Sequence, residues 1–242
     1  MSLPDSPAIP ERSAPTRLFI TGTDTGVGKT QVSQALLLAL NGQGWRSAAM
    51  KPLASGCSLN AGEYQNEDAL ALQAAASLQH PYRDINPYAL PHPTAPQIAA
   101  RLANRQIEME PILAAAGRLA AGADLLLVEG VGGWLAPLSD QLMQADLARA
   151  LQCRVILVVG LRLGCLNHAL LTERAVRADG LTLCGWIGSA VDPEFEHAAD
   201  YHQLLEQQLS CPWLGSLPFQ PDPLKAAQAL DGRRLATALV TT

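Results

Sequence analysis

Short runs of apolar residues alternate along this chain with longer stretches whose apolar positions recur at helical spacing. The runs 125–128 and 155–159 are apolar at every position, which is typical of strands covered on both faces. Alternation of such strands with helices predicts βα units on a parallel sheet. We therefore expect an α/β fold in three layers, with a mostly parallel central sheet and helices on both faces.

The same pattern gives bounds for the expected elements. Strands are expected at 17–21, 47–52, 124–129, 154–160, 183–189 and 212–217. Helices are expected at 29–41, 68–78, 96–104, 110–121, 144–151, 167–178 and 196–208. The segments 51–66 and 130–141 are predicted to be long loops, and loops at the carboxyl ends of parallel strands are where such sheets bind ligands.

The first sixteen residues break the pattern. Prolines at positions 4, 7, 10 and 15 stand among polar and acidic residues, without an uninterrupted apolar stretch. Residues 1–16 are therefore predicted to be a disordered tail rather than a signal peptide. The remainder, 17–242, suits a single α/β domain.

Charge and cysteine content narrow the possible partners. A net charge of −5 gives no electrostatic footprint for nucleic acid or anionic lipid, and no apolar run approaches the roughly 18 residues that cross a bilayer. The five cysteines are dispersed, without a CxxC pair, which favours free thiols in a reducing compartment. We expect a cytoplasmic protein with no nucleic-acid and no membrane partner.

The strongest chemical signal is the segment 18–30, LFITGTDTGVGKT, in which an apolar strand leads through a glycine-bearing turn into a helix. Glycine lets backbone N–H groups close on phosphate oxygens, and the helix N-terminus adds a positive dipole end. Lys29 would reach the terminal phosphates, and the Thr30 hydroxyl would ligate magnesium. Five residues separate Gly22 from Gly28, one more than in the common pattern. The context still predicts a nucleoside triphosphate site in a fold of the P-loop NTPase type.

Further candidate residues stand where the expected strands and helices begin or end. Glu129 closes a buried strand, where P-loop proteins place a carboxylate that holds magnesium or its water shell; the alternative is a cap on the following glycine loop. Lys51, at another strand end, is equally well explained as a phosphate contact or a solvated lysine. Asp68 and Asn167 are more simply explained as residues that complement or cap a helix start, and Ser55 alone indicates nothing.

Other chemistries lack their patterns in this sequence. There is no HExxH pair for zinc, no GxSxG nucleophile elbow and no GxGxxG dinucleotide loop. The sequence therefore gives no support for a zinc site, a serine hydrolase or a dinucleotide-binding fold.

Taken together, the segments resemble the dethiobiotin synthetases, small P-loop enzymes of biotin synthesis. The resemblance runs from about residue 17 to 215 and lies in short motifs that follow the family's order. They are TGTDTGVGKT at 21–30, KPLASG at 51–56, NEDALAL at 66–72, NPY at 86–88, VEGVGGW at 128–134, PLSD at 137–140, LGCLNHA at 163–169 and GWI at 185–187. Each motif is weak alone, but the ordered set is specific.

The resemblance implies a ligase that converts 7,8-diaminopelargonate, carbon dioxide and ATP into dethiobiotin, ADP and phosphate. One amine captures carbon dioxide as a carbamate, the carbamate attacks the γ-phosphate to give a carbamoyl phosphate, and the neighbouring amine closes the ureido ring. Such chemistry depends mainly on in-line placement and charge neutralisation. The resemblance also implies Mg²⁺ as cofactor and a homodimer with the substrate site at its interface.

The resemblance assigns roles to individual residues. Lys51 is implied to be the catalytic lysine, acting together with Lys29. The implied magnesium ligands are Thr30, Asp68 and Glu129. The implied nucleotide contacts are Thr25, Gly26, Val27, Gly28, Lys29, Thr30, Gln31, Asp68, Glu129, Gly132, Ser189, Ala190, Pro218, Phe219 and Gln220. The implied substrate contacts are Ser55 at the diamine end and Gly164, Cys165 and Asn167 at the carboxylate tail, reaching across a homodimer interface, with Cys165 acting through its backbone.

Two positions depart from the better-known members. Ser189-Ala190 stands where they often carry Asn-Asp, and Gly26 stands where some carry Glu. An asparagine side chain reads the adenine edge through paired hydrogen bonds, which serine cannot make. The preference for ATP over other triphosphates is therefore open, and base selection is expected to shift to backbone groups around 218–220.

Three alternatives compete with the synthetase hypothesis. An amidotransferase of the cobyrinate type needs a glutaminase partner or domain, for which 242 residues leave no room. A partition-type ATP switch carries an extra lysine soon after the first glycine, where this chain has Thr23, Asp24 and Thr25. A degenerate paralogue would bind nucleotide without turnover, and the intact set of Lys29, Lys51 and their expected metal ligands argues against it.

Overall fold

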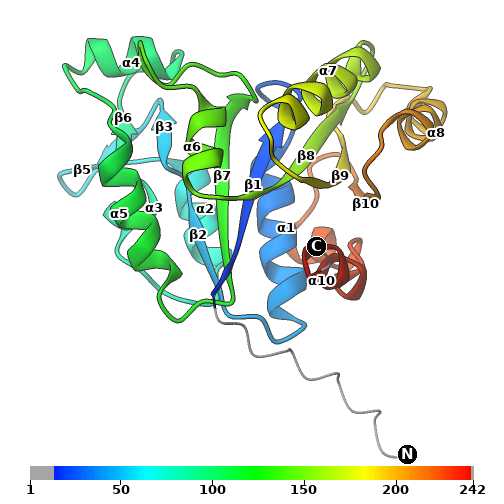
Figure 1. Cartoon of the computed structure of the whole chain (residues 1–242), viewed down its shortest axis with the longest axis horizontal. Coiled ribbons are helices and arrows are strands. Elements are labelled where there is room, and N and C mark those ends of the chain that lie inside the picture. The colour runs from blue at the N-terminus through cyan, green and yellow to red at the C-terminus, as the bar shows by residue number, and fades with distance from the viewer. Residues whose placement is uncertain (1–13, 241–242) are drawn as a thin grey trace, which may run out of the picture.

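Six parallel strands form the central sheet of the computed structural model, which describes residues 14–240 (Figure 1). They are β1 Thr16–Gly22, β2 Ser47–Met50, β7 Leu125–Gly133, β8 Arg154–Leu161, β9 Leu183–Ala190 and β10 Trp213–Leu217, in the spatial order β10-β9-β8-β1-β7-β2. Because all strands run the same way, the segments that follow them emerge along one edge. The fold class predicted from the sequence is confirmed.

Helices cover both faces of this sheet. They are α1 Lys29–Asn41, α2 Glu67–Ala75, α3 Tyr82–Ile85, α4 Pro96–Leu102, α5 Met109–Ala120, α6 Gln144–Ala150, α7 Cys165–Ala178, α8 Ala198–Gln208, α9 Pro223–Gln228 and α10 Gly232–Val240. Two small sheets lie beside the main one: β3 Leu53–Ser55 pairs with β6 Tyr88–Leu90, and β4 Ser58–Asn60 forms a hairpin with β5 Glu63–Gln65. No described helix has the length and apolarity needed to span a membrane.

The side chains of β1 point alternately to the two faces of the sheet and so contact both helical layers. Leu18 and Ile20 belong to the cluster that packs under α1, whereas Phe19 belongs to the cluster that packs under α5, α6 and α7. Successive side chains of a strand point to opposite faces, and all three are fully buried. Complete burial of one such side chain stabilises the fold by about 1.5–3 kcal/mol, so both helical layers are held by the same strand.

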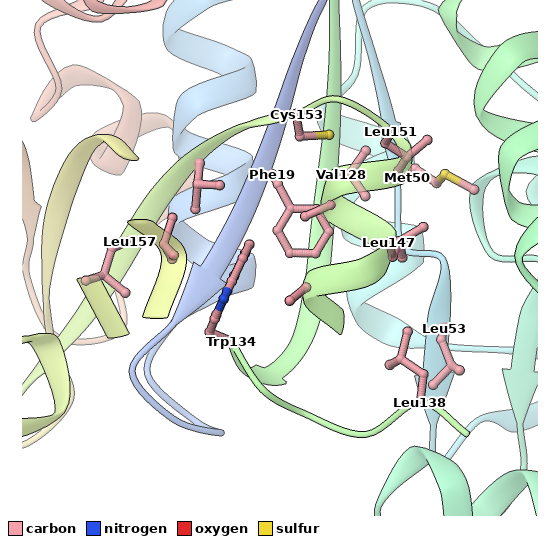
Figure 2. Packing of buried hydrophobic residues seen from close by; sticks show 14 of the residues in the cluster. Phe19, Met50, Leu53, Val128, Trp134, Leu138, Leu147, Leu151, Cys153 and Leu157 are labelled. Carbon is pink, nitrogen blue, oxygen red and sulfur yellow. The ribbon is translucent and has the colours of Figure 1, made fainter. Parts of the chain in front are cut away.

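The segment after β7 is anchored by an aromatic pair. Figure 2 shows Trp134 against Phe19, with ring centroids 6.1 Å apart and planes at 89°. The Trp134 indole N–H donates to Asp179 at 2.7 Å. An edge-to-face pair with a satisfied indole N–H is a favourable arrangement, and it fixes the glycine-rich end of β7 beside the P-loop.

The main strands and helices lie where the apolar pattern predicts them, while the expected loops differ. Segment 51–66 contains β3, β4 and β5 rather than one long loop, and β7 continues through Gly133 instead of ending at 129. Glycines have low strand propensity, yet Gly133 pairs with Gly22 of β1. The pattern also missed α3, β6, α9 and α10.

The N-terminal prediction is tested only at its edge. Strand β1 begins at Thr16, one residue earlier than expected. Residues 1–13 lie outside the described residues, so the disordered tail stays a prediction, as does the single domain over 17–242.

Candidate active site

A cavity of about 990 Å³ opens at the edge where the parallel strands end. Its wall combines the P-loop, the end of β2, the start of α2 and the segment after β7. The lining residues that the sequence predicted are Thr25, Gly26, Gly28, Lys29, Thr30, Gln31, Lys51, Ser55, Asp68, Glu129 and Gly132. Segments far apart in sequence therefore supply one site, as expected for the carboxyl edge of an open α/β sheet.

The P-loop is shaped by glycines in left-handed conformations. Gly26 and Gly28 have φ of +72° and +84°, and Gly28 forms the N-cap of α1 without any side-chain cap. Such angles favour glycine. Val27, a predicted nucleotide contact, is buried in the core and is not among the residues that line the cavity. The first turn of α1 holds no acidic residue, which leaves its N–H groups and positive dipole end available to phosphate.

Lys29 lies folded back over the P-loop. Its Nζ donates to the carbonyl oxygen of Asp24 at 2.9 Å. Burial lowers the pKa of Lys29 from 10.5 to about 8, with a further lowering by the charge of Lys51, which outweighs the opposite effect of nearby carboxylates. An ammonium held in this way needs an anion, and the terminal phosphates of a nucleotide would supply one.

A second buried lysine forms the centre of the charge cluster. Lys51 Nζ lies 2.5 Å from Glu129 Oε1 and 3.3 Å from Asp68 Oδ2, and Thr30 Oγ1 donates to the same Glu129 oxygen at 2.9 Å. Burial alone would lower the pKa of Lys51, but Glu129 and Asp68 together raise it above its ordinary value. Lys51 therefore stays protonated, and the solvated-lysine alternative is wrong because only 4% of this residue is exposed.

The backbone of Lys51 is also fixed. Its N–H donates to Ile85 O at 2.8 Å, and its carbonyl accepts from Asn86 Nδ2 at 2.6 Å. Tyr82 Oη donates to Asn86 Oδ1 and accepts from Asn66 N–H, the residue that caps α2. This chain of hydrogen bonds links the backbone of Lys51 to the helix that carries Asp68, and it gives Asn86 of the motif at 86–88 a structural role.

The oxygen atoms of this cluster are suited to a magnesium ion that keeps part of its water shell, and not to a metal ion enclosed by protein ligands alone. Glu129 Oε2 is buried and has no hydrogen-bond partner, while Thr30 and the half-exposed Asp68 adjoin the same cluster. Among residues 14–240 no group of three or more His, Cys, Asp or Glu is arranged to hold a metal. Magnesium commonly takes one or two carboxylates and completes its shell with waters and substrate phosphates, so two carboxylates and a hydroxyl suit it.

A smaller cavity of about 170 Å³ adjoins the P-loop on the side of β9. Ser189 is buried there, and a Cβ built on Gly28 would lie 2.4 Å from its hydroxyl oxygen. The lining residues are Gly26, Gly28, Gln31, Ser189, Ala190, Val191, Pro218, Phe219, Gln220 and Pro221. Residues 218–220, where base selection is expected, thus meet Ser189-Ala190 in one cavity.

The expected substrate contacts separate into two groups. Ser55 lines the large cavity, and its hydroxyl oxygen is buried without a hydrogen-bond partner. Gly164, Cys165 and Asn167 begin α7 and do not line that cavity. Gly164 and Asn167 are exposed, and the neighbouring Leu163 is 80% exposed. The expectation that these three residues reach across a homodimer interface requires such a separation within one chain, and it stays a prediction. The alternative that Asn167 caps the helix is wrong, because Gly164 is the N-cap and Asn167 lies inside α7.

Several residues at the site had no distinguishing local pattern. The cavity is also lined by Asn66, Pro93, Thr94 and Pro96, which come from the start of α2 and from the approach to α4. Their spacing in the sequence carries no motif that would single them out. Only the resemblance, which included Asn66, could have indicated any of them.

Comparisons with known proteins agree with this geometry. A family model described as an AAA domain, AAA_26, matches residues 16–226. The chain is 52% identical over 215 residues to the ATP-dependent dethiobiotin synthetase BioD of Xanthomonas oryzae pv. oryzae strain PXO99A, a match that covers 89% of this chain and 96% of that one. It is 51% identical over 209 residues to the protein of the same name from Xylella fastidiosa strain 9a5c, covering 86% and 92%.

Among solved structures, the signal recognition particle receptor FtsY from Elizabethkingia anophelis, in complex with GDP, has a TM-score of 0.55 at 13% identity. The match covers 98% of this chain and 66% of that one, and at this identity it supports the fold alone. The sequence relatives are much closer and are matched over nearly their whole length. On this evidence the chain belongs to the ATP-dependent dethiobiotin synthetase family.

Proposed function

We propose that this protein catalyses the ATP-dependent ring closure of 7,8-diaminopelargonate with carbon dioxide, giving dethiobiotin, ADP and phosphate. As a member of its family it is a ligase of biotin biosynthesis. The observation that carries the proposal is the buried ammonium of Lys51, held by Glu129 and Asp68 inside the cavity that the P-loop lines. Two lysines facing one phosphate site are suited to a reaction that builds negative charge there.

The nucleotide end of the site follows from the P-loop. Backbone N–H groups around Gly26–Thr30 would hold the phosphates, and Lys29 would leave the carbonyl of Asp24 for the terminal phosphate. Thr30, Asp68 and Glu129 would hold Mg²⁺, which when bound would neutralise charge on the phosphate oxygens. The remaining predicted contacts, including Gly132 beside Thr25 and the residues of the small cavity, would surround the ribose and base.

The substrate end requires a nucleophile placed in line with the γ-phosphate. We propose that Lys51 contacts the carbamate formed from one amine and carbon dioxide, and then the phosphoryl oxygens, while Ser55 orients the diamine through its unpartnered hydroxyl. Attack on the γ-phosphate forms a carbamoyl phosphate with loss of ADP. The second amine then attacks the carbonyl carbon, closes the ring and expels phosphate, so that one ATP is consumed for each ring.

We propose that the carboxylate tail of the substrate binds to the start of α7 of a second subunit. Gly164, Cys165 and Asn167 lie outside the large cavity, next to the exposed Leu163. A homodimer that buries this surface would bring the start of α7 to the partner's cavity, and the positive end of the α7 dipole suits a carboxylate. We further propose a cytoplasmic location, which agrees with the five free cysteines.

The proposal is tested by phosphate release with magnesium, bicarbonate and ATP, measured with and without the diamine and repeated with CTP and GTP. Release that depends on the diamine is expected. Release that is equal with and without the diamine, or absent with every triphosphate, would contradict the proposed function. Diaminopelargonate acetylated on both amines serves as the control substrate, because it cannot form the carbamate.

A further inference from the structure

We infer that Gln144 is a positioning residue for this reaction, acting on Lys51 through the peptide bond between Gly130 and Val131. The inference rests on the proposed function, in which Lys51 is the catalytic lysine. Gln144 begins α6 and only 1% of it is exposed. It lines neither cavity described above, so any effect on the reaction would pass through other residues.

One peptide group connects Gln144 with Lys51. The N–H of Val131 donates to Gln144 Oε1 at 2.5 Å, and the carbonyl oxygen of Gly130, on the other side of the same peptide, accepts from Lys51 Nζ at 3.4 Å. A peptide group is planar, so a hydrogen bond that fixes its N–H also fixes the direction of its C=O. Gln144 thereby orients one of the three acceptors around the Lys51 ammonium.

The same carboxamide ties this peptide to the P-loop strand. Gln144 Nε2 donates to Gly133 O at 2.8 Å and lies 3.4 Å from Thr21 Oγ1 in β1. Gly133 itself pairs with Gly22, where the P-loop begins. The carboxamide therefore makes hydrogen bonds at both ends of the segment 131–133, and a buried amide with its donor and acceptor both used favours one geometry.

Glycine at position 130 is explained by this contact. A Cβ there would lie 2.4 Å from Gln144 Oε1 and 2.7 Å from its Cδ. The φ of Gly130 is not in the left-handed region, so the requirement for glycine comes from the approach of the side chain and not from the backbone angle. Gly130 and Gln144 thus act as a matched pair.

The test compares Gln144→Met, which keeps the length of the side chain but removes its three hydrogen bonds, with Gln144→Glu, which keeps an oxygen for the N–H of Val131. Gln141→Met is the matched control, because Gln141 is exposed. Turnover is measured with ATP and divided by the number of nucleotide-binding sites, which is obtained by titration with a non-hydrolysable ATP analogue. Gln144→Met should lower kcat about tenfold or more while the analogue Kd and the KM for the diamine change less than about threefold.

Gln144→Glu should recover most of the lost kcat, and Gln141→Met should match the parent protein. The inference would be overturned if Gln144→Met kept the parental kcat. It would also be overturned if Gln144→Met and Gln144→Glu lost the same factor in kcat, since the packing of the side chain would then explain the residue. If Gln144→Met fails to fold, Gly130→Ala is used; its methyl displaces the carboxamide, and an unchanged kcat would contradict the inference. A parent protein that forms no dethiobiotin would overturn the proposed function as well, whereas an active parent with unaffected variants would overturn this inference alone.

Discussion

The two ends of the proposed reaction site differ in how completely this chain builds them. At the P-loop end, Lys29, Lys51 and Glu129 are buried, and Lys51 forms an ion pair with Glu129. At the start of α7, Gly164 and Asn167 are exposed and lie outside the cavity. The charged centre is thus assembled within one chain, whereas the expected tail-binding residues line neither of the two cavities described above.

The largest expected effect comes from the complete end. Lys51→Ala should lower kcat by about 1,000-fold or more, equivalent to about 4 kcal/mol in the activation barrier, because it removes a buried charge that the proposed reaction places beside the reacting groups. Nucleotide binding should remain detectable, since the P-loop contacts persist. Product formation and binding of a fluorescent ATP analogue measure the two effects. Full activity in this variant would remove Lys51 from the mechanism.

A substitution at the start of α7 should weaken binding of the diamine substrate and leave binding of the nucleotide almost unchanged. Leu163→Asp places a charge on the exposed surface beside the expected tail site. We expect a monomer in light scattering and a KM for the diamine about 10–100-fold higher, while the Kd for MgATP changes less than about threefold. Leu224→Asp is the matched control, because Leu224 on α9 is 64% exposed. A dimeric Leu163→Asp protein with parental KM would place the tail elsewhere.

The pH dependence of nucleotide binding should report the protonation of Lys29 at the P-loop end of the site. The pKa of Lys29 is lowered to about 8 by burial and by Lys51, so the free protein loses this positive charge as pH rises through 8. Binding of a phosphate favours the charged form of Lys29, so the protein takes up a proton when MgATP binds. The affinity for MgATP therefore falls as pH rises. Between pH 7 and 9 the Kd for MgATP should rise about tenfold.

Calorimetry in buffers of different ionisation enthalpy measures that proton uptake directly. Lys29→Arg is the matched variant, since arginine stays charged across this range, and its Kd should vary much less with pH. A parent protein that binds MgATP equally well at pH 7 and 9 would show that Lys29 does not titrate as described.

The smallest expected effect concerns the base. Ser189 lies in the small cavity against Gly28, and its hydroxyl cannot make the paired contact of a carboxamide. Ser189→Asn should increase the preference for ATP over CTP and GTP by a factor of about 3–10. Competition among the three triphosphates for one site measures the ranking. An unchanged order would show that the base is read elsewhere.

Most of the framework was predictable because it follows local patterns. The continuous apolar runs and helical spacing located the sheet and its covering helices, and the bounds of α1 agree at both ends. The P-loop was predictable for the same reason, since strand, turn and helix are contiguous. Strand β7 was cut short in the prediction because its last residues are mainly glycines, whose pairing depends on contact with β1.

Residues that act through distant partners were not predictable in this way. Asn86 fixes the carbonyl of Lys51 across 35 positions, and the carboxamide of Gln144 reaches Thr21 across 123. Neither belongs to a local spacing rule, because the fold alone brings these partners together.

The most direct test of the central claim follows carbon from bicarbonate. With ¹³C-bicarbonate, Mg²⁺, ATP and 7,8-diaminopelargonate, the account predicts dethiobiotin that carries one ¹³C in its ureido carbonyl, with one phosphate and one ADP formed for each ring. Mass spectrometry and a coupled phosphate assay give both numbers from one reaction. Phosphate release without a labelled ring, or no product at all, would contradict the account.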